Sequence, residues 1–219
     1  MSGFTVHSIP GSPFGRAVLA MLQEKGVPYR FSTVAPGTLR SPEHLARHPF
    51  GRVPVLEHDG YMLYETQAIL RYLDRVLPQP SLTPTDAKRA ARMDQAMNVN
   101  DWYLFHGVGN VIVFHRVIGP RVMGLKPDEA AIEAAMPKAL TVFNELAHLL
   151  GDRPYFAGDT LSLADLMLAP PVEFFAMIPE WSSLGAPHAN LVAWLTRMQE
   201  RPSMKATTWE RVSELAKAA

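Results

Sequence analysis

The sequence contains no cysteine among its 219 residues. Structural disulfides, thiolate zinc sites and a cysteine nucleophile are therefore excluded. Disulfide exchange through an enzyme thiol is excluded for the same reason. Any thiol chemistry that this protein carries out must use the thiol of a ligand.

An excess of charge of one sign is also absent. The chain has 21 basic and 21 acidic residues, a formal net charge of zero and a pI near 7.1. Proteins that bind nucleic acid or anionic membranes through electrostatics have a basic excess. We therefore expect neither nucleic acid nor membrane as a partner, and favour a small molecule or another protein.

Long apolar runs are missing as well. No uninterrupted apolar stretch approaches the roughly 20 residues that span a bilayer, and the first residues lack the basic and apolar regions of a secretory signal. We therefore expect a cytoplasmic protein. The sequence has no glycine fingerprint of a nucleotide site and no internal repeat.

The first third of the chain alternates strand patterns with helical patterns, which predicts an α/β domain over residues 1–77. Asp59-Gly60 lies between two apolar runs, which is typical of a hairpin, so part of the sheet is predicted to be antiparallel. The expected strands cover residues 4–8, 29–33, 55–58 and 61–63. The expected helices cover residues 13–25, a short stretch after Pro42, and 65–77.

The proline-rich segment 78–85 ends this alternation and is predicted to be a linker. The chain that follows has helical patterns only, so residues 86–219 are predicted to form an all-α domain. A long amphipathic stretch runs from Thr85 to about Ile118, and residues 119–126 are expected to form a loop. Pro127-Asp128-Glu129 is suited to the start of the next helix.

A further helix start is marked by Leu161-Ser162-Leu163-Ala164-Asp165-Leu166. Ser162 can cap the helix while Asp165 accepts from the Ser162 backbone N–H, and Leu161 can pack on Leu166. This capping box predicts a structural role for Ser162 and Asp165.

The most informative motif is Gly51-Arg52-Val53-Pro54, followed by Glu65-Thr66. The Val53-Pro54 bond comes where a strand would begin, and an X-Pro bond can be cis at a cost of only ~0.5–1 kcal/mol. A turn there would leave the Val53 N–H and C=O to pair with an extended peptide ligand. Glu65-Thr66 precedes a helical pattern, so free N–H groups would meet a ligand carboxylate while Glu65 meets an ammonium.

At these residues the chain resembles the cytosolic glutathione transferases, whose thioredoxin-like domain has a cis-proline and an acidic–hydroxyl pair that opens the third helix. The resemblance extends from the strand at Phe4 to the helix around Trp194 and the Arg201-Pro202-Ser203 that follows. It implies a thioredoxin-like domain followed by an all-helical domain, and glutathione as co-substrate. The Ser162–Asp165 box matches the capping box of that family's core helix 6.

Ser12 is the candidate for activating the glutathione thiol. A free thiol with a pKa of ~8.5 is mostly protonated at neutral pH, so the site needs a hydrogen-bond donor near sulfur. Ser12 is expected to cap the first helix, where the helix dipole also favours negative charge. The motif resembles serine-type transferases of the theta, delta and phi classes, whose serine precedes an arginine by four residues, here Ser12 and Arg16. Ser8 stays an alternative, as does a purely structural cap at Ser12.

The resemblance also assigns further glutathione contacts. Arg40 and Arg52 lie where family members carry polar or basic groups that reach glutathione, although both are equally consistent with solvated surface arginines. Phe50 resembles the aromatic key that phi-like subunits insert into their partner, which would make the protein a homodimer; alternatively it packs within its own domain. The predicted glutathione-binding residues are Phe14, Arg40, Arg52, Val53, Pro54, Glu65 and Thr66.

The acceptor substrate is expected to bind between the two domains, against the first helix and the long helix that follows the linker. The candidates on the long helix are Tyr103, His106, Asn110, Val113 and Phe114, and helical spacing favours burial in the core for any single apolar one of them. His44 and His48 have the i,i+4 spacing of a metal-binding pair but lack a third ligand nearby, so no metal is expected.

Together these observations predict a glutathione transferase that attacks small hydrophobic electrophiles with a thiolate held by Ser12, with peroxidase activity as a possible extension. Two other functions stay open. The fold can serve as a binding or assembly module with little turnover. Glutathione can also act as a cofactor that is not consumed, as in isomerases and dehalogenases.

Overall fold

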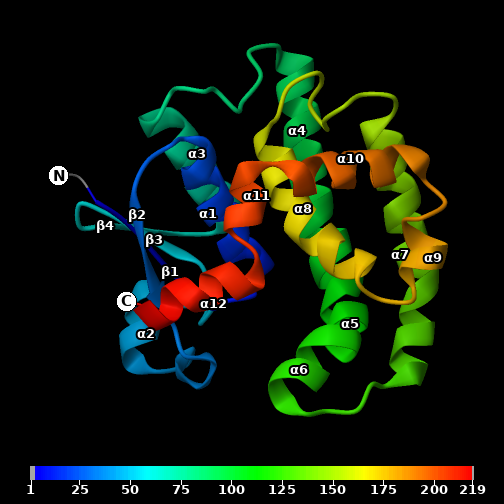
Figure 1. Cartoon of the computed structure of the whole chain (residues 1–219), viewed down its shortest axis with the longest axis horizontal. Coiled ribbons are helices and arrows are strands. Elements are labelled where there is room, and N and C mark those ends of the chain that lie inside the picture. The colour runs from blue at the N-terminus through cyan, green and yellow to red at the C-terminus, as the bar shows by residue number, and fades with distance from the viewer. Residues whose placement is uncertain (1–2, 219) are drawn as a thin grey trace. The chain divides into compact units, whose positions relative to one another are not determined.

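The computed structural model describes residues 3–218 and divides the chain into two compact units. One unit contains the described residues up to Leu82 together with the C-terminal segment from Gln199. The other contains Thr83–Met198 (Figure 1). The division lies inside the predicted linker, residues 78–85. The sequence predicts that the C-terminal segment belongs to the helical domain, whereas in the structure it packs on the first unit.

A four-stranded sheet in the order β2-β1-β3-β4 organises the first unit. β1 pairs in parallel with β2 and antiparallel with β3, and β3 pairs antiparallel with β4 through the hairpin at Asp59-Gly60. Both hairpin residues have positive φ, +50° and +81°, as the Asp-Gly turn predicts. The strands are β1 (Phe4–Ser8), β2 (Tyr29–Thr33), β3 (Val55–His58) and β4 (Tyr61–Tyr64).

This topology brings four loops to one edge of the sheet. β1, β2 and β4 run in the same direction and end there, whereas β3 runs in the opposite direction and begins there. The register pairs Val55 with both His7 and Tyr64. The segments after Ser8 and after Tyr64 therefore lie beside the segment before Val55.

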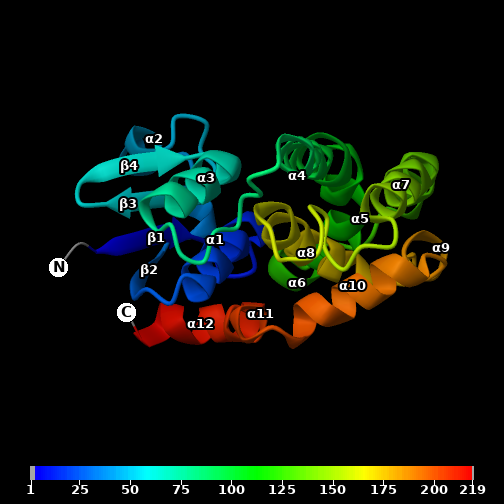
Figure 2. The same cartoon turned by 90° about the horizontal axis from the view of Figure 1, so that it is seen from above.

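Helices α1 and α3 pack together and on the sheet, and lie on the same side of it in both views (Figures 1 and 2). Their apolar faces form the core of the unit with Val6, Val55 and Leu56, all fully buried. The helices of this part of the unit are α1 (Pro13–Glu24), the 3₁₀ turn Pro36–Thr38, α2 (Pro42–Arg47) and α3 (Thr66–Val76).

The Lys25 ammonium, whose side chain is fully buried, joins the end of α1 to the chain that follows α3. Its Nζ donates to Asp74 Oδ1 at 2.7 Å, to the Leu77 carbonyl at 2.6 Å and to the Pro80 carbonyl at 2.5 Å. The Asp74 Oδ1 also accepts from the Leu82 N–H at 3.0 Å. Because all three ammonium protons have acceptors, this buried charge is compensated.

The C-terminal helices α11 (Pro202–Ala206) and α12 (Trp209–Ala218) complete the first unit. α11 packs on α1 and α12 on β2, as Figure 2 shows along one side of the unit. Arg201 Nη2 pairs with Glu24 Oε2 at 2.7 Å, and Arg16 Nη2 donates to the Met204 carbonyl at 3.1 Å. These polar contacts, with the packing, attach the segment to α1.

The second unit is helical throughout its regular structure. Its first helical run covers residues 87–123 and contains two π-helical stretches. Its core contains two edge-to-face pairs of fully buried aromatic rings, which are Phe143 with Phe175 and Phe156 with Trp194. The elements are α4 (Ala87–Val99), π-helical Asn100–Gly109, α5 (Asn110–Val113), π-helical Phe114–Ile118, α6 (Gly119–Met123), α7 (Glu129–Leu150), α8 (Leu163–Ala176), α9 (Trp181–Leu184) and α10 (Ala189–Glu200).

The expectation of a loop over residues 119–126 was wrong for its first half. Gly119–Met123 forms α6, and Gly124 ends it with φ +66°. Pro120 is the second residue of α6, where the chain passes directly from the π-helical stretch Phe114–Ile118 into α6.

The predicted capping box at the start of α8 is present. Asp165 Oδ2 accepts from the Ser162 N–H at 2.9 Å and from the Ser162 hydroxyl at 2.6 Å. Asp165 Oδ1 accepts from the Phe156 N–H at 3.0 Å and from the Trp194 indole N–H at 2.9 Å. The carboxylate therefore joins α8 to α10 and to the preceding loop.

Candidate active site

A pocket of about 470 Å³ lies at the sheet edge where the four loops meet. Three of the residues predicted to bind glutathione line it, namely Arg40, Arg52 and Glu65, together with Pro49 and Phe50. It is lined by two guanidinium groups and one carboxylate. The pocket can therefore take a ligand that carries both negative and positive charge.

The Val53 backbone is available to a ligand at this edge. The Val53-Pro54 bond is cis, as predicted. Among residues 3–218, neither the N–H nor the C=O of Val53 makes a hydrogen bond. Since backbone polar groups are nearly always paired, an open donor and acceptor on one residue is the arrangement that accepts an added strand.

Glu65 has a strained backbone, with φ +70° and ψ +113°. It stands immediately before α3 and its side chain caps nothing, so the carboxylate remains exposed at the pocket. Thr66, the first residue of α3, is 6% exposed. Non-glycine residues at positive φ cost of order 1–3 kcal/mol and concentrate at functional sites.

Ser12 caps α1 and keeps its hydroxyl proton free to donate. Its Oγ accepts from the Gly15 N–H at 3.1 Å, and its side chain is half-buried. Because a hydroxyl oxygen can accept while its proton donates elsewhere, the cap leaves the donor available. The helix has 12 residues, so its dipole adds positive potential at this end.

The alternative serine, Ser8, is fully buried. α1 lies directly over it, since a Cβ added at Gly15 would come within 2.1 Å of Ser8 Oγ. Of the two candidates, Ser12 is therefore the accessible hydroxyl at this edge.

Sequence reasoning missed Trp209, which packs on the loop that carries Ser12. Gly11 has φ +86°, and a Cβ there would lie 2.5 Å from the Trp209 ring. This contact joins residues almost 200 positions apart, and no local pattern predicts it. Trp209 thereby helps to fix the loop before α1.

The sequence suggests for His44 only the spacing of a metal pair, whereas in the structure its ring contacts a backbone carbonyl. Its Nε2 lies 2.9 Å from the carbonyl oxygen of Arg52, beside the open Val53 backbone. The His48 ring instead lies tilted against the Tyr64 ring, with ring centroids 4.7 Å apart. Within residues 3–218 there is no group of three or more side chains arranged to hold a metal ion.

Comparison with known proteins agrees with this geometry. The family model "Glutathione S-transferase, N-terminal domain" matches residues 6–81, and "Glutathione S-transferase, C-terminal domain" matches residues 108–202. The probable glutathione S-transferase GSTF2 of Oryza sativa subsp. japonica is 33% identical over 188 residues, which cover 84% of this chain and 86% of the relative. The chain belongs to the glutathione S-transferase family.

Solved structures of the family share the fold. Glutathione transferase F7 from Populus trichocarpa superposes with a TM-score of 0.83 at 27% identity, covering 97% of this chain and 99% of its own. Glutathione S-transferase-I, solved with the ligand lactoylglutathione, has a TM-score of 0.80 at 28% identity and covers 99% of both chains. The relatives are plant phi-class enzymes, and the family uses glutathione as co-substrate.

The residues predicted to line the acceptor pocket lie on the first helical run of the second unit, in different environments. Tyr103 is 61% exposed, and His106 and Asn110 are also exposed. Val113 is buried in the core of its unit at 8% exposure, and Phe114 is half-buried. Tyr103, His106 and Asn110 therefore belong to the solvent-exposed face of this helical run. A role for this face in binding an acceptor stays a prediction.

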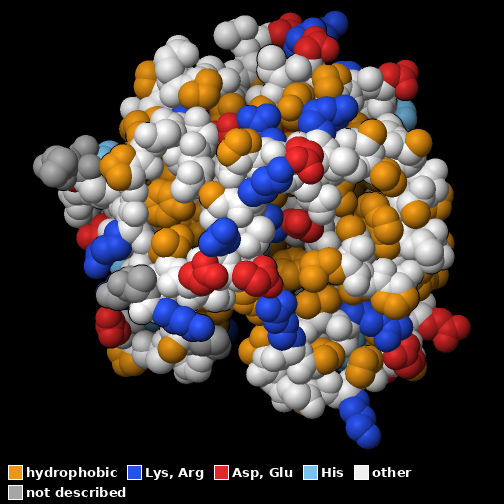
Figure 3. Space-filling model, viewed as in Figure 1, with side chains coloured by type: hydrophobic (Ala, Val, Ile, Leu, Met, Phe, Trp, Pro, Cys, Tyr) orange, Lys and Arg blue, Asp and Glu red, His pale blue; other side chains and the backbone are white. Residues whose placement is uncertain are grey.

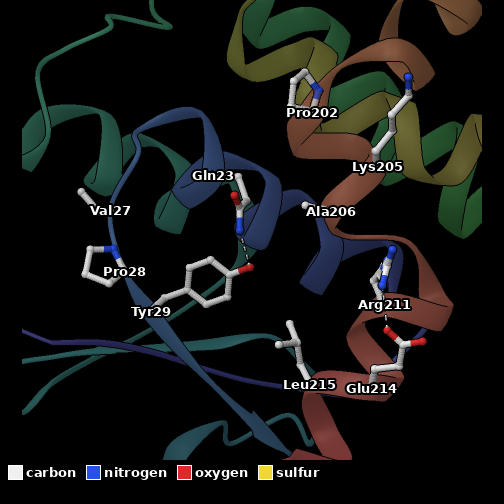
Figure 4. Close-up of a pocket in the computed structure, with 10 residues that line it drawn as sticks. All are labelled: Gln23, Val27, Pro28, Tyr29, Pro202, Lys205, Ala206, Arg211, Glu214 and Leu215. Atoms are coloured by element: carbon white, nitrogen blue, oxygen red, sulfur yellow. Dashed lines mark hydrogen bonds and ion pairs between the residues drawn. The ribbon is translucent and has the colours of Figure 1, made fainter.

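A larger pocket, of about 950 Å³, lies elsewhere on the first unit, beside β2, α11 and α12. Figure 3 shows apolar side chains exposed in this region, next to charged side chains. Two pairs of polar groups in its lining bond to each other: Gln23 Nε2 donates to the Tyr29 hydroxyl at 3.0 Å, and Arg211 pairs with Glu214 at 3.1 Å (Figure 4). None of the predicted glutathione residues lines this pocket.

None of the helices in the described part of this transferase is both long and apolar enough to span a membrane.

Proposed function

We propose that this protein conjugates the thiol of glutathione to small hydrophobic electrophiles, and that Ser12 holds the thiolate. The observation that carries the proposal is the position of Ser12. Its half-buried hydroxyl caps α1 on the loop after β1, at the sheet edge where the open Val53 backbone and the Glu65 pocket lie.

Glutathione carries two carboxylates, one ammonium and a peptide backbone, and each has a complementary group at this edge. The Val53 N–H and C=O pair with the backbone of the cysteinyl residue, as an added strand would. Glu65 meets the ammonium, and the α3 N-terminus at Thr66 meets the neighbouring carboxylate. Arg40 and Arg52 meet the glycyl carboxylate. Phe14, the second residue of α1, lies beside the cysteinyl portion.

The chemical step needs the sulfur as a thiolate. The Ser12 hydroxyl donates a hydrogen bond to sulfur, and the α1 dipole favours its negative charge, so the thiol ionises near neutral pH. A fall of one pKa unit corresponds to about 1.4 kcal/mol in favour of the thiolate. The thiolate then attacks an electrophilic carbon, a C–S bond forms, and the leaving group departs with the bonding electrons. A peroxide oxygen is a second electrophile that the same thiolate can attack.

The proposal is tested by retention on immobilised glutathione, followed by assay of the retained protein with a panel of electrophiles and peroxides. We expect elution by free glutathione and turnover of at least one electrophile. Retention without turnover would favour a binding module. Turnover in which glutathione is not consumed would favour an isomerase or dehalogenase, and absence of retention would contradict a glutathione site.

We also propose that the protein is a cytoplasmic homodimer. Phe50 is 61% exposed and makes edge contacts with His48 and Tyr64, with ring centroids 6.2 and 6.3 Å apart. A large apolar ring held in this way at the surface is suited to insertion into a partner subunit.

A further inference from the structure

We infer that His44 is a positioning residue for glutathione, because it fixes the peptide plane whose N–H receives the ligand backbone. This inference rests on the proposed function and adds a residue to its binding machinery. It depends on the hydrogen bond between the His44 ring and the Arg52 carbonyl, and on the planarity of the peptide that follows.

The His44 side chain can make this bond only as a donor. A carbonyl oxygen accepts but cannot donate, so Nε2, at 2.9 Å from the Arg52 oxygen, carries the proton. His44 is 3% exposed, and its Nδ1 is buried without a partner. An apolar ring would fill the same space without leaving a polar atom unpaired. The imidazole is therefore better explained by its bond to Arg52 than by packing.

The Arg52 carbonyl belongs to the same peptide unit as the Val53 N–H. The cis bonds within residues 3–218 are Val53-Pro54 and Gln79-Pro80, so the Arg52-Val53 peptide is trans. In a planar trans peptide the C=O and the N–H point in opposite directions. Because His44 holds the carbonyl toward α2, the N–H of Val53 is directed to the opposite side, where it has no partner among these residues.

The elements around His44 are themselves held in place. The His44 N–H donates to Ser41 Oγ at 3.2 Å, which caps α2, and the His48 N–H donates to the His44 carbonyl at 2.9 Å. The Gly51 N–H then donates to the His48 carbonyl at 2.8 Å. Gly51 has φ +61°, and a Cβ there would lie 2.7 Å from the Leu39 carbonyl. The turn that delivers Arg52 to the His44 ring is therefore tightly constrained.

The experiment compares His44→Phe and His44→Gln with wild-type protein. Phe keeps the planar ring but removes the donor, whereas Gln retains an N–H donor on a side chain of similar reach. We expect His44→Phe to raise the KM and the dissociation constant for glutathione about tenfold, and to leave kcat at saturating glutathione within about twofold. His44→Gln should recover most of the lost affinity.

The control is His58→Phe, at the opposite end of β3, where the ring Nδ1 lies 2.7 Å from the Tyr72 hydroxyl. This variant removes a part-buried histidine bond without touching the Arg52 carbonyl, so the KM for glutathione should stay unchanged. Equal glutathione affinity in folded His44→Phe and wild type would overturn the inference. If His44→Phe does not fold, a His44→Gln variant with weak affinity would overturn it. If wild-type protein itself does not bind glutathione, the proposed function fails instead.

Discussion

At the scale of single residues, the site depends on backbone positions that ordinary side chains avoid. Glu65 holds φ +70° although it is not glycine, and no cap bond from its own side chain compensates. The second non-glycine residue at positive φ among residues 3–218 is Asp59, in the hairpin turn. The hairpin turn explains the positive φ of Asp59. No turn explains that of Glu65, and its strained backbone places the carboxylate at the pocket.

We predict that Glu65→Gly weakens glutathione binding without destabilising the fold. Glycine relieves the strain, which is of order 1–3 kcal/mol, but adds chain entropy to the unfolded state, which costs about 0.5–1 kcal/mol. We expect the free energy of unfolding to stay the same or to rise by up to about 2 kcal/mol, measured by denaturant titration. The KM for glutathione should rise about tenfold or more, because a charged hydrogen bond contributes about 1.5–3 kcal/mol.

Asp59→Gly is the matched control for this variant. It makes the same exchange of an acidic residue for glycine at positive φ, but at the far end of β3, away from the pocket. Its KM for glutathione should equal that of wild type. A similar rise in both variants would mean that Glu65 acts through the fold and not through its charge.

The sequence predicted those local features of the candidate site that depend on neighbouring residues. The Val53-Pro54 turn, the Glu65-Thr66 pair and the Ser12 cap are each recognised within a few neighbouring residues, and the structure brings Arg40, Arg52 and Glu65 into one pocket. His44 and Trp209 were missed in these roles for a physical reason. Each acts through a contact with a backbone segment that only the folded chain brings near.

At the scale of elements, the Asp165 carboxylate is the polar centre of the second unit. It is fully buried and accepts from two backbone N–H groups, one hydroxyl and one indole. Burial raises the pKa of this carboxyl, and the four hydrogen bonds act in the opposite direction. The network joins the start of α8 to the loop at Phe156 and to Trp194 of α10, so we predict a structural role for Asp165.

We therefore predict that Asp165→Ala lowers the free energy of unfolding by about 4 kcal/mol or more, since several buried donors lose their acceptor at once. Asp86→Ala is the comparison. The Asp86 carboxylate caps the exposed start of α4 through one bond to the Arg89 N–H at 2.9 Å, and its loss should cost about 1 kcal/mol. Both values come from denaturant titration. Equal losses would contradict a network role for Asp165.

The order and type of the early elements followed from the sequence, because strand and helix periods alternate clearly in residues 4–76. The boundaries of β1, β2 and β3 were predicted to the residue. The prediction was weaker after residue 100, where π-helical stretches depart from the regular period and Pro120 is accommodated inside a helical run. Proline and glycine therefore mark the end of a helix reliably only where the neighbouring helical turns cannot change their geometry to accommodate them.

At the scale of the whole molecule, buried histidines connect stability to pH. His7 is 4% exposed and His48 is 2% exposed, and burial lowers the pKa of each below the ordinary value of 6.5. Below pH 6.5 these histidines become protonated in the unfolded chain while they stay neutral in the folded chain. Protonation therefore stabilises the unfolded state, so the free energy of unfolding is highest above pH 6.5 and decreases as the pH falls below it.

The free energy of unfolding should accordingly decrease between pH 7 and pH 5, a range above the titration of most carboxylates. The measurement is denaturant titration at several pH values. A variant with both histidines replaced, His7→Asn and His48→Phe, should show a flatter dependence. An unchanged slope in that variant would contradict the assignment to these two groups.

The fold class and the family were predictable for the whole chain, but the path of its last residues was not. Residues from Gln199 onward pack on the first unit through contacts with Glu24, Arg16 and Gly11. Helical periodicity predicts that α11 and α12 exist. It says nothing about which unit receives their apolar faces, because that depends on surfaces that fold elsewhere in the chain.

The most direct test of the central claim is the ultraviolet absorbance of glutathione thiolate bound to the protein, measured against pH in wild type, Ser12→Ala and Ser12→Thr. We predict a bound thiol in wild type with a pKa clearly below the ordinary ~8.5. The pKa should return toward that value in Ser12→Ala and be largely restored in Ser12→Thr, which keeps the hydroxyl. The same lowered pKa in wild type and Ser12→Ala would contradict the role of Ser12 in activating glutathione.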